Sequence, residues 1–479
     1  MAAFAEASGW LASMVRAIEI AIVALVSVLA YTAGALRRLL IFDRARRAEH
    51  RAHARGRLLR WSFTRLGATF VKVGQIMSSR PDLFSAGVIA ELRWLQDRVP
   101  PFPFATVRAV IERELGAPVE HWFREIDSTA VAAGSVAQVH RGVLWNGNEV
   151  AIKVLRPDVL TRVRRDARIL LWLAHFSHLV SARARGVNVV GHTLDLVTGI
   201  LAQTDLRRER NNYERFRRNF AETPGLAFPR VYPRFSTRWM LTMEFIHGTR
   251  VDETHVDHLP GAARVIRSMF FTMCFDHGFI HADLHPGNVL ITKDGGVVIL
   301  DVGLVKKIPT TVLRQVVDFT RCLVNGDARD LVAHLKRFHR YLEGTDWAAV
   351  ETDAASFIAG IRRKAISELE LSAVVGDLFA LAHKHKIRPI PEMTLVLLGM
   401  VTSEGMAKLL DPSVDTVSEL AKHLGGQCAP RQRLARGSQQ WRPLSITRAP
   451  RLPRPAHATS RPSPTHGPAS VARAQVRHR

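Results

Sequence analysis

The chain has 479 residues and a formal net charge of +24, and 47% of its residues are hydrophobic. This length is sufficient for two or three domains with packed cores, so most of the chain is expected to fold. Three scattered cysteines (Cys274, Cys322 and Cys428) show no CxxC spacing, which argues against a zinc site or a disulfide framework and indicates a reducing compartment.

Residues 20–36 contain no charged residue, and the run is at the short end of the length that spans a bilayer. A basic cluster from Arg37 to Arg65 follows, and the positive-inside rule places it on the cytoplasmic side, with the N-terminus outside. A membrane anchor is therefore predicted. A signal peptide cleaved at Ala33–Ala35, an interfacial helix and a buried helix are the alternatives.

Helical patterns follow in the next part of the chain. They cover Trp61–Gln75, Ala90–Asp97, Phe104–Leu115 and Val119–Arg124. The first contains the sequence KVGQ, from Lys72 to Gln75. By pattern alone, Lys72 and Gln75 are simply polar residues on a helix.

The pattern then changes to strands. The runs Val139–Trp145 and Glu149–Leu155 are joined through Asn-Gly, a strong hairpin signal. Small residues precede the first run, and the second contains VAIK, ending at Lys153. This order resembles the N-lobe of a kinase, in which a small-residue loop lets backbone N–H groups approach phosphates and the lysine pairs with the α- and β-phosphates. The loop residues predicted to bind nucleotide are Ala133, Gly134, Ser135 and Val136.

Long helices are predicted from Pro157 to Phe220. Within them, Glu209 is the candidate partner of Lys153, although a solvated helix face with i,i+4 ion pairs would give the same charge pattern. A buried strand is predicted over Trp239–Phe245. In a kinase-like fold its end, Met243-Glu244, is the hinge that meets adenine.

The sequence HADLHPGN ends at Asn288, and Asp301-Val302-Gly303 follows thirteen residues later. Phosphoryl transfer needs a carboxylate near the nucleophile and oxygen ligands that hold Mg²⁺ against the phosphates. Asp283 is the candidate for the first role, and Asn288 with Asp301 for the second. After Gly303 the chain enters helical sequence almost directly, with no Ala-Pro-Glu segment and no long activation loop, which argues against a protein substrate.

The remainder to about Leu424 is predicted to be helical, and its apolar run Met393–Val401 is too short to span a bilayer. The predicted helices are Ala328–Tyr341, Ala348–Ser367, Leu371–His385 and Thr394–Leu410. The segment from Arg431 to the end contains eleven arginines and no acidic residue. Such charge favours anionic partners, but a single aromatic residue in this segment (Trp441) disfavours nucleic-acid binding through base stacking.

Taken together and in order, KVGQ, the alanine-rich loop, VAIK, HADLHPGN and the Asp301 triplet are similar to the UbiB family of atypical kinase-like proteins. The resemblance covers roughly Leu58–Pro412. It implies an α+β, protein-kinase-like, two-lobed fold, with an N-terminal helical KxGQ extension packed over the site and a mostly α-helical C-lobe. It also places Lys72 and Gln75 in the active site.

The resemblance further implies ATP and Mg²⁺ as cofactors, and an atypical kinase or ATPase activity that supports ubiquinone biosynthesis. The implied location is a membrane, with the kinase-like domain on the cytoplasmic side. Export through a cleaved signal peptide would separate such a domain from its ATP. The implied partners are membrane lipids, a lipid-like quinone precursor or quinone-biosynthesis enzymes. A protein kinase acting on protein substrates and a non-catalytic nucleotide-binding scaffold are the alternatives.

The patterns and the resemblance divide the chain into five parts. These are a membrane-anchor helix with its basic flank (1–55), the helical KxGQ extension (56–125), a kinase-like N-lobe with inserted helices (126–245), a helical C-lobe with catalytic loop and metal triplet (246–424), and a disordered Arg- and Pro-rich tail (425–479).

Two residues depart from the family pattern. The family usually has a glutamate two residues before Asp205, where this chain has Gln203. If that glutamate pairs with the KxGQ lysine, Lys72 is expected to make a weaker, neutral hydrogen bond here. Gly134 stands where a third alanine is usual, which gives the loop more backbone freedom.

Overall fold

The computed structural model describes residues 2–34, 43–78, 84–95, 100–181, 189–254, 259–324, 328–339, 341, 344–363 and 368–425. The chain divides into two units, 1–428 and 429–479, and every described residue belongs to the first. All but the first residue of the predicted tail, and residues 35–42 of the predicted anchor and its flank, lie outside the described residues.

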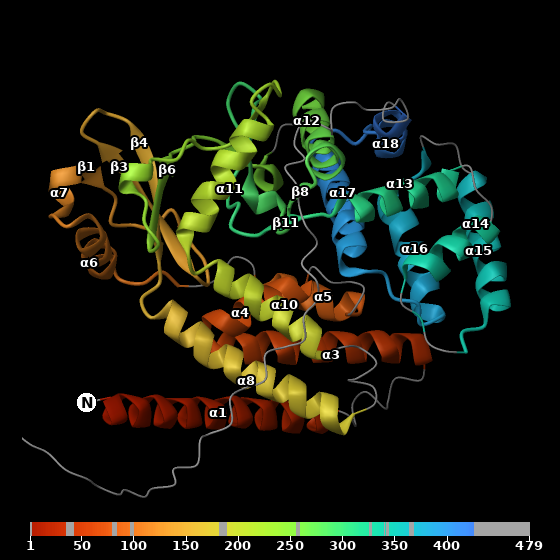
Figure 1. Ribbon diagram of the computed structural model, residues 1–479, viewed down its shortest axis with the longest axis horizontal. Helices are drawn as coiled ribbons and strands as arrows, with labels where there is room; N and C mark the ends of the chain where they lie inside the picture. Colours follow the sequence, from red (N-terminus) through yellow and green to blue (C-terminus); the bar gives the residue numbers. More distant parts are fainter. Residues whose placement is uncertain are drawn as a thin grey trace, which may run out of the picture. The chain divides into compact units, whose positions relative to one another are not determined.

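The first four described helices of the chain stack on one another (Figure 1). They are α1 (Ala2–Ala33), α3 (Arg44–Leu66), α4 (Ala68–Ser78) and α5 (Ala86–Arg93). The predicted helix Trp61–Gln75 is thus two helices, which meet at Gly67. The φ of +87° at Gly67 is one that residues with a side chain rarely adopt. The helix predicted over Ala90–Asp97 begins earlier, at Ala86.

The N-lobe is an antiparallel sheet in the order β1-β3-β4-β6, with β2 also paired to β3. Its strands are β1 (Phe123–Ile126), β2 (Ala132–Ala133), β3 (Ala137–Leu144), β4 (Glu149–Leu155) and β6 (Met240–Glu244). The predicted Asn-Gly hairpin between β3 and β4 is confirmed, and the φ of Gly147 is +85°.

Two helices, α6 (Phe104–Leu115) and α7 (Val119–Trp122), pack against this sheet. The prediction that the second helix extends to Arg124 is wrong, because β1 begins at Phe123. The Phe123 side chain is buried in the cluster under the sheet, and its backbone pairs with Leu144. Burial of one aromatic side chain therefore overrides the local helical pattern.

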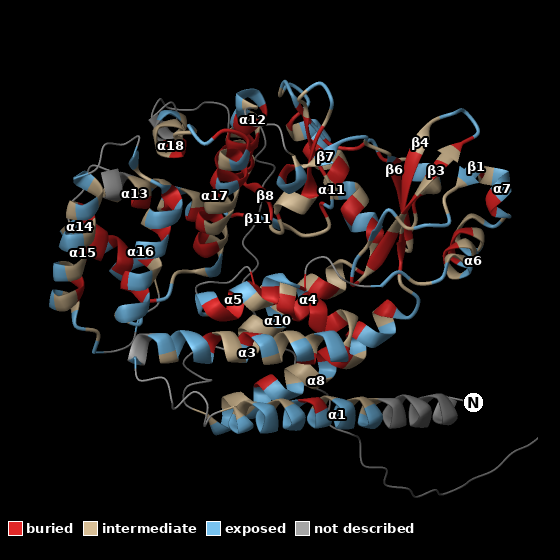
Figure 2. Cartoon of the chain, turned by 180° about the vertical axis from the view of Figure 1, so that it is seen from behind, coloured by how far each residue is buried: buried red, intermediate tan, exposed pale blue. Residues whose placement is uncertain are grey.

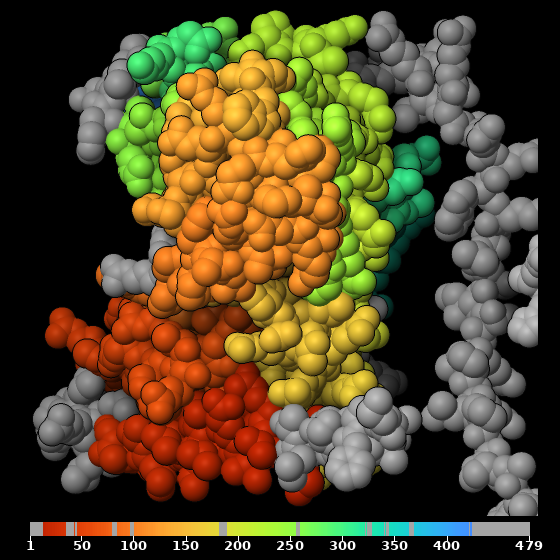
Figure 3. Space-filling model, turned by 90° about the vertical axis from the view of Figure 1, so that its left-hand side faces the viewer, coloured from red at the N-terminus to blue at the C-terminus, as the bar shows by residue number. Residues whose placement is uncertain are grey.

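Three long helices are inserted between β4 and β6. They are α8 (Val159–Val180), α10 (Val189–Ala202) and α11 (Leu206–Asn219). Helices α8 and α10 pack on each other and contact α4, whereas α11 contacts β6. Asp205 caps α11, since its side chain accepts a hydrogen bond from the Arg207 N–H. Figure 3 shows the N-terminal helices (red) below the sheet (orange), with α8 (yellow) beside them.

The C-lobe combines two small sheets with a large helical body. One sheet has the order β5-β10-β9-β7, and β8 pairs with β11 in the other. These strands are β5 (Leu226–Ala227), β7 (Thr249–Arg250), β8 (Phe279–His281), β9 (Val289–Ile291), β10 (Val297–Ile299) and β11 (Val305–Lys307). The sequence did not predict β11, a three-residue strand between Gly303 and the next helix.

The helices described in the C-lobe are α12 (Pro260–Phe271), α13 (Thr310–Val324), α14 (Ala328–Phe338), α15 (Trp347–Arg362), α16 (Leu371–Lys384), α17 (Pro391–Leu410) and α18 (Thr416–Gly425). The four predicted helices from Ala328 to Leu410 correspond to α14, α15, α16 and α17, with small shifts at their ends. A π-helical turn, Thr272–Asp276, extends α12 towards β8. The structure is therefore α+β with a mostly helical C-lobe, as predicted.

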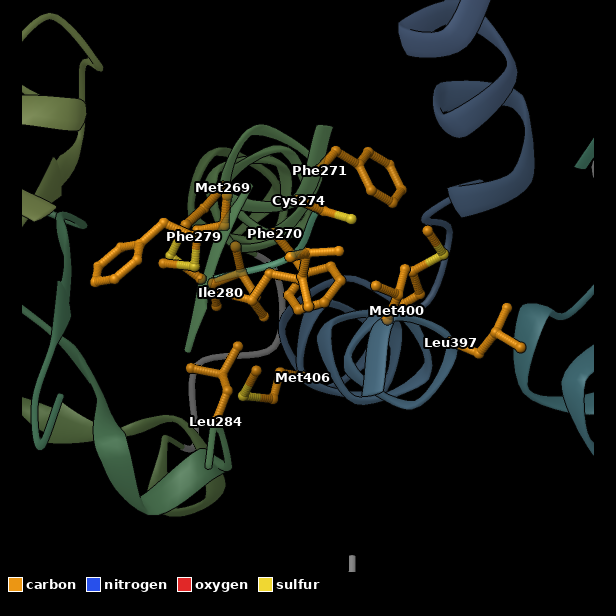
Figure 4. Packing of buried hydrophobic residues seen from close by; sticks show 14 of the residues in the cluster. Met269, Phe270, Phe271, Cys274, Phe279, Ile280, Leu284, Leu397, Met400 and Met406 are labelled. Atoms are coloured by element: carbon orange, nitrogen blue, oxygen red, sulfur yellow. The ribbon is translucent and has the colours of Figure 1, made fainter. Parts of the chain in front are cut away.

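The C-lobe core is centred on the contact between α12 and α17 (Figure 4). Gly399 of α17 lies against the buried ring of Phe270, and a Cβ atom there would be 2.1 Å from Cζ of that ring. Helix α17 is long and apolar enough to cross a membrane, but 56% of its apolar window is buried, as in a core helix. The corresponding window of α1, Ser13–Ala33, is only 6% buried (Figure 2).

Candidate active site

Lys153 of β4 joins three parts of the fold. Its Nζ donates to both carboxylate oxygens of Glu209 on α11, at 2.8 and 2.9 Å, and to Oδ1 of Asp301 after β10, at 3.1 Å. The predicted contact between Lys153 and Glu209 is therefore present. Glu209 is only 4% exposed, so this ion pair lies inside the protein.

The charges of these three groups are coupled. Burial lowers the pKa of Lys153, but Asp301 and Glu209 outweigh it and the pKa is raised overall. Burial raises the pKa of Glu209 to about 7, against the opposing effect of Lys153. Partial burial opposes ionisation of Asp301, yet Lys153 and Lys72 together lower its pKa. The site thus holds a permanent cation beside a permanent anion.

Side chains on one face of α11 form hydrogen bonds with the backbone of the Asp301 triplet. Asp301 has a φ of +48°, and its N–H donates to the hydroxyl of Tyr213 at 2.9 Å. The Asn212 side chain donates to the Val302 carbonyl at 2.9 Å. Together with Glu209, these residues occupy positions i, i+3 and i+4 of one helix face. Sequence analysis missed Asn212 and Tyr213, although this spacing was the available signal.

The HADLHPGN segment leaves β8 and is held by its own side chains. The N–H of Asp283 donates to Nδ1 of His281 at 3.2 Å, and Nε2 of His281 donates to the Leu300 carbonyl at 3.4 Å. These partners require the neutral imidazole, in agreement with burial, which lowers the pKa of His281. The Asn288 amide donates to the Asp283 carbonyl at 3.1 Å, which fixes the separation between these two residues.

Lys72 of α4 reaches this segment from the N-terminal helices. Its Nζ donates to Oδ2 of Asp283 at 2.9 Å, and the two side chains are 10% and 29% exposed. Burial raises the pKa of Asp283, but the charges of Lys72 and His285 and the hydrogen bond from Lys72 together outweigh it and lower the pKa overall. The expected neutral hydrogen bond of Lys72 is therefore wrong, because α4 is placed so that its ammonium group meets a carboxylate.

Comparison with known proteins identifies the family to which the chain belongs. Residues 94–335 match the model of the ABC1 atypical kinase-like domain, and residues 354–415 match that of the UbiB helical domain. The chain belongs to the UbiB family. These matches also confirm the predicted kinase-like fold.

Curated relatives agree with this assignment. The chain is 33% identical over 386 residues to the probable protein kinase UbiB of Sodalis glossinidius, covering 76% of this chain and 69% of that protein. It is 32% identical over 411 residues to the probable protein kinase UbiB of Pseudomonas paraeruginosa, covering 81% and 75%. The solved complex of Rv3197 with erythromycin, from Mycobacterium tuberculosis, aligns at a TM-score of 0.43 and 20% identity, covering 71% of this chain and 91% of that chain.

The two polar residues of the KVGQ sequence in this UbiB family member point in different directions. Lys72 points to Asp283, whereas the Gln75 amide donates to the Leu95 carbonyl at 2.9 Å, beyond the end of α5. A Cβ on Gly74 would lie 2.4 Å from Leu95 and 2.8 Å from Phe63, so glycine permits the close packing of α4 on its neighbours. The structure brings Lys72 into the candidate site and does not bring Gln75 there.

The predicted nucleotide loop is a compact turn between β2 and β3. Ala133 ends β2, the N–H of Gly134 donates to the Ala137 carbonyl at 2.8 Å, and Ser135 is 5% exposed. Arg156, just after β4, closes the turn from the other side. Its side chain donates to the Gly134 carbonyl at 2.9 Å, and its backbone N–H donates to the Val136 carbonyl at 2.8 Å.

The predicted hinge lies at the end of β6. Met243 is 6% exposed and pairs with Ala151 of β4. Glu244 is exposed, and its backbone and carboxylate exchange hydrogen bonds with the backbone of Arg230. The two residues therefore lie where the chain leaves the N-lobe sheet, one facing the core and the other facing solvent.

The residues fit a magnesium nucleotide. Mg²⁺ is commonly held by one or two protein oxygen groups, with phosphates and water completing its shell. Asp301, whose side chain is 54% exposed, and the side-chain oxygen of Asn288 are donors of this kind. Within the described part of the chain, no group of three or more His, Cys, Asp or Glu side chains is arranged to hold a metal ion. Because Asp301 and Asn288 would supply only two protein ligands, the pair suits an ion whose remaining ligands are phosphate oxygens and water.

Proposed function

We propose that the protein is a membrane-associated atypical kinase or ATPase of the UbiB type, which binds MgATP and supports ubiquinone biosynthesis. The observation that carries this proposal is the contact of Lys153 with both Glu209 and Asp301. This contact holds a cation and a metal-ligating carboxylate side by side, as phosphoryl transfer requires. The name of the curated relatives, probable protein kinase UbiB, supports the link to phosphoryl chemistry and to ubiquinone.

Each group has a defined part in this proposal. The ammonium group of Lys153 would hold the α- and β-phosphates, and Glu209 fixes its position. Asn288 and Asp301 would hold Mg²⁺, which neutralises phosphate charge when it is bound. Asp283 lies five residues before Asn288 and would face the acceptor, either water or a lipid-like molecule.

Two features favour such an acceptor over a protein. Lys72 lies on Asp283, the carboxylate that would take the proton from a hydroxyl substrate. The chain also passes from Gly303 through β11 into α13 at Thr310, without the long segment that helps to build a peptide-docking surface in protein kinases. Membrane lipids or a quinone precursor are therefore the proposed partners.

The first test is ATP turnover by the full-length protein, measured as phosphate release with and without anionic liposomes. Asp301→Asn removes a metal-ligating charge, and turnover is expected to fall to the background. Asp294→Asn makes the same chemical change in the exposed turn between β9 and β10 and is expected to keep turnover. Equal turnover by wild type and Asp301→Asn would overturn the catalytic assignment.

A second test separates an enzyme from a nucleotide-binding scaffold. A deletion strain is complemented with wild type or with Asp301→Asn, and its quinone content is measured. If the protein acts as an enzyme, Asp301→Asn is expected not to restore the quinone content of the deletion strain. Full restoration by a variant that still binds nucleotide but does not turn it over would favour the scaffold.

A further inference from the structure

Helix α1 presents an apolar stripe to solvent. Ile18, Ile22, Leu25 and Leu29 recur every three or four residues, which places them on one helix face, and each is 55–58% exposed. A helix on a water-soluble protein normally turns this face towards the core. A contiguous apolar surface of this kind marks an interaction site. In Figure 2 the outer side of α1 is drawn largely as exposed.

The opposite face of α1 carries its polar contacts. Nε and Nη2 of Arg16 donate to the two carboxylate oxygens of Asp166 on α8, at 2.8 and 3.2 Å, and Asp166 is 2% exposed. Nη2 of Arg16 also donates to the Leu66 carbonyl at 2.6 Å, and the hydroxyls of Ser27 and Ser62 are 2.7 Å apart. Release of α1 would leave a buried carboxylate without its partner, so this helix is fixed to the protein.

Helix α8 continues the exposed apolar surface. Trp172, Phe176 and Leu179 are 65%, 51% and 76% exposed, and the two aromatic rings stack at 5.7 Å. Leu170, on another face of α8, packs in the same cluster as Val23 of α1. Figures 1 and 3 show α8 beside α1 at the same edge of the unit. The outward stripe of α1 and these three residues of α8 are called the apolar platform below.

Exposed arginines lie on α8 and on α3, the helix that packs on α1. Helix α3, which packs on α1, contains eight arginines and one glutamate, and Arg51, Arg55 and Arg65 are exposed. Helix α8 adds exposed Arg164 and Arg168. Apolar side chains beside arginines match the boundary between acyl chains and anionic headgroups. Two copies of the chain joined through this surface would bring like charges together.

A membrane-spanning position of α1 is incompatible with these contacts. If α1 crossed the bilayer while docked, the arginines of α3 and the Arg16–Asp166 pair would lie in hydrocarbon, where charges are costly. We propose that α1 stays docked and lies in the plane of an anionic membrane surface, with the apolar platform inserted at the interface. The proposal rests on the membrane association included in the proposed function and specifies its geometry and its lipid charge.

The test is co-sedimentation of the full-length protein with vesicles of phosphatidylcholine alone or mixed with phosphatidylglycerol. Wild type is expected to bind the anionic vesicles more tightly. Trp172→Glu is expected to weaken this binding by about tenfold or more, since an aromatic side chain that would insert at the membrane interface is replaced by a charge. Trp145→Glu is the matched control, because Trp145 is 64% exposed on the hairpin between β3 and β4, outside the platform. An equal effect of both variants would overturn the proposal.

A topology experiment distinguishes an in-plane helix from a spanning one. In vesicles with the kinase-like unit on the outside, protease is expected to remove an epitope added before Met1, and protection of that epitope would overturn the proposal. Light scattering without lipid tests self-association. If Trp172→Glu dissociates a dimer and leaves vesicle binding unchanged, the platform binds a second copy instead. These readouts do not depend on ATP turnover, and Asp301→Asn is expected to bind vesicles as wild type does.

Discussion

The contact between α12 and α17 and the attachment of the N-terminal helices use different interactions. Between α12 and α17, Phe270 packs directly on Gly399 in a buried apolar core (Figure 4). The N-terminal helices also make apolar contacts, such as that of Val73 with the same core, but they add two ion pairs to distant parts of the chain, Lys72 with Asp283 and Arg16 with Asp166. Close-packed apolar contacts respond to shape, whereas ion pairs respond to salt, pH and competing ligands.

This difference indicates separate tasks for the two regions. The helical core of the C-lobe includes Phe279 and Ile280 of β8, so apolar packing holds the start of the HADLHPGN segment in place. The attachment of α4, by contrast, ends on Asp283, a residue of the candidate site.

Gly399→Ala is expected to have the largest effect on stability. The new Cβ would lie 2.1 Å from the Phe270 ring, which is fully buried and cannot move without displacing its neighbours. Overpacking of this kind destabilises by about 1–3 kcal/mol. The measurement is the free energy of unfolding in urea, and the loss is expected to be the same at low and high salt.

Gly405→Ala on the same helix is the matched control. No atom lies within 4 Å of a Cβ at this exposed position, so the substitution is expected to stabilise the helix by about 0.5–1 kcal/mol. If both variants have the same stability, the close approach of Phe270 to Gly399 is not a feature of the folded protein.

Glu404→Ala is the next largest expected effect. The Glu404 carboxylate is 2% exposed and accepts from the N–H groups of Leu371 and Ser372, at 3.1 and 2.9 Å, at the start of α16. Loss of a buried acceptor costs about 1–3 kcal/mol. Thermal unfolding checks this, with Glu404→Gln as the milder variant because it keeps one acceptor oxygen. A larger loss for Glu404→Gln than for Glu404→Ala would contradict the capping role.

The sequence predicted those parts of the site that local signals specify. The Asn-Gly turn and the alternating runs around Lys153 sufficed for the hairpin, and the charge density of α11 pointed to Glu209. The three-residue strand β11 was missed, because its pairing with β8 depends on partners and not on a pattern of its own.

Long-range contacts of the N-terminal helices could not be predicted. Lys72 and Asp283 are 211 positions apart, and their contact depends on how α4 is tilted over the catalytic segment. The orientation of Gln75 depends on Leu95 in the same way. The resemblance to the family indicated which helix covers the site, but not which polar atom each side chain meets.

Arg16→Met tests the second attachment. The Arg16 guanidinium satisfies a buried carboxylate, so its loss is expected to detach α1 locally and to lower global stability by only about 1 kcal/mol. Hydrogen exchange along α1 is expected to accelerate. Combining Arg16→Met with Asp166→Leu removes both charges and is expected to restore slow exchange. Unchanged exchange in the single variant would show that the apolar contacts of α1 suffice.

Lys72→Met is expected to have the smallest effect on stability, within about 1 kcal/mol, because the Asp283 side chain is 29% exposed and water can hydrate it when the lysine is lost. Since Lys72 lowers the pKa of Asp283, the folded protein binds this proton less readily than the unfolded chain. The stabilisation is therefore present at neutral pH and is lost as the pH falls below 3.8, through the depressed pKa. Wild type and Lys72→Met are expected to converge in high salt and in acid, as measured by urea unfolding.

Asp283→Asn is the partner variant for this test. In this background Lys72→Met is expected to change stability little, because the substitution has removed the carboxylate that pairs with the Lys72 ammonium group. A difference between wild type and Lys72→Met that persists in high salt and in the Asp283→Asn background would come from packing of the lysine stem. In that case α4 would be attached by apolar contacts alone, as α17 is, and the contrast between the two regions would fail at the residue nearest the candidate site.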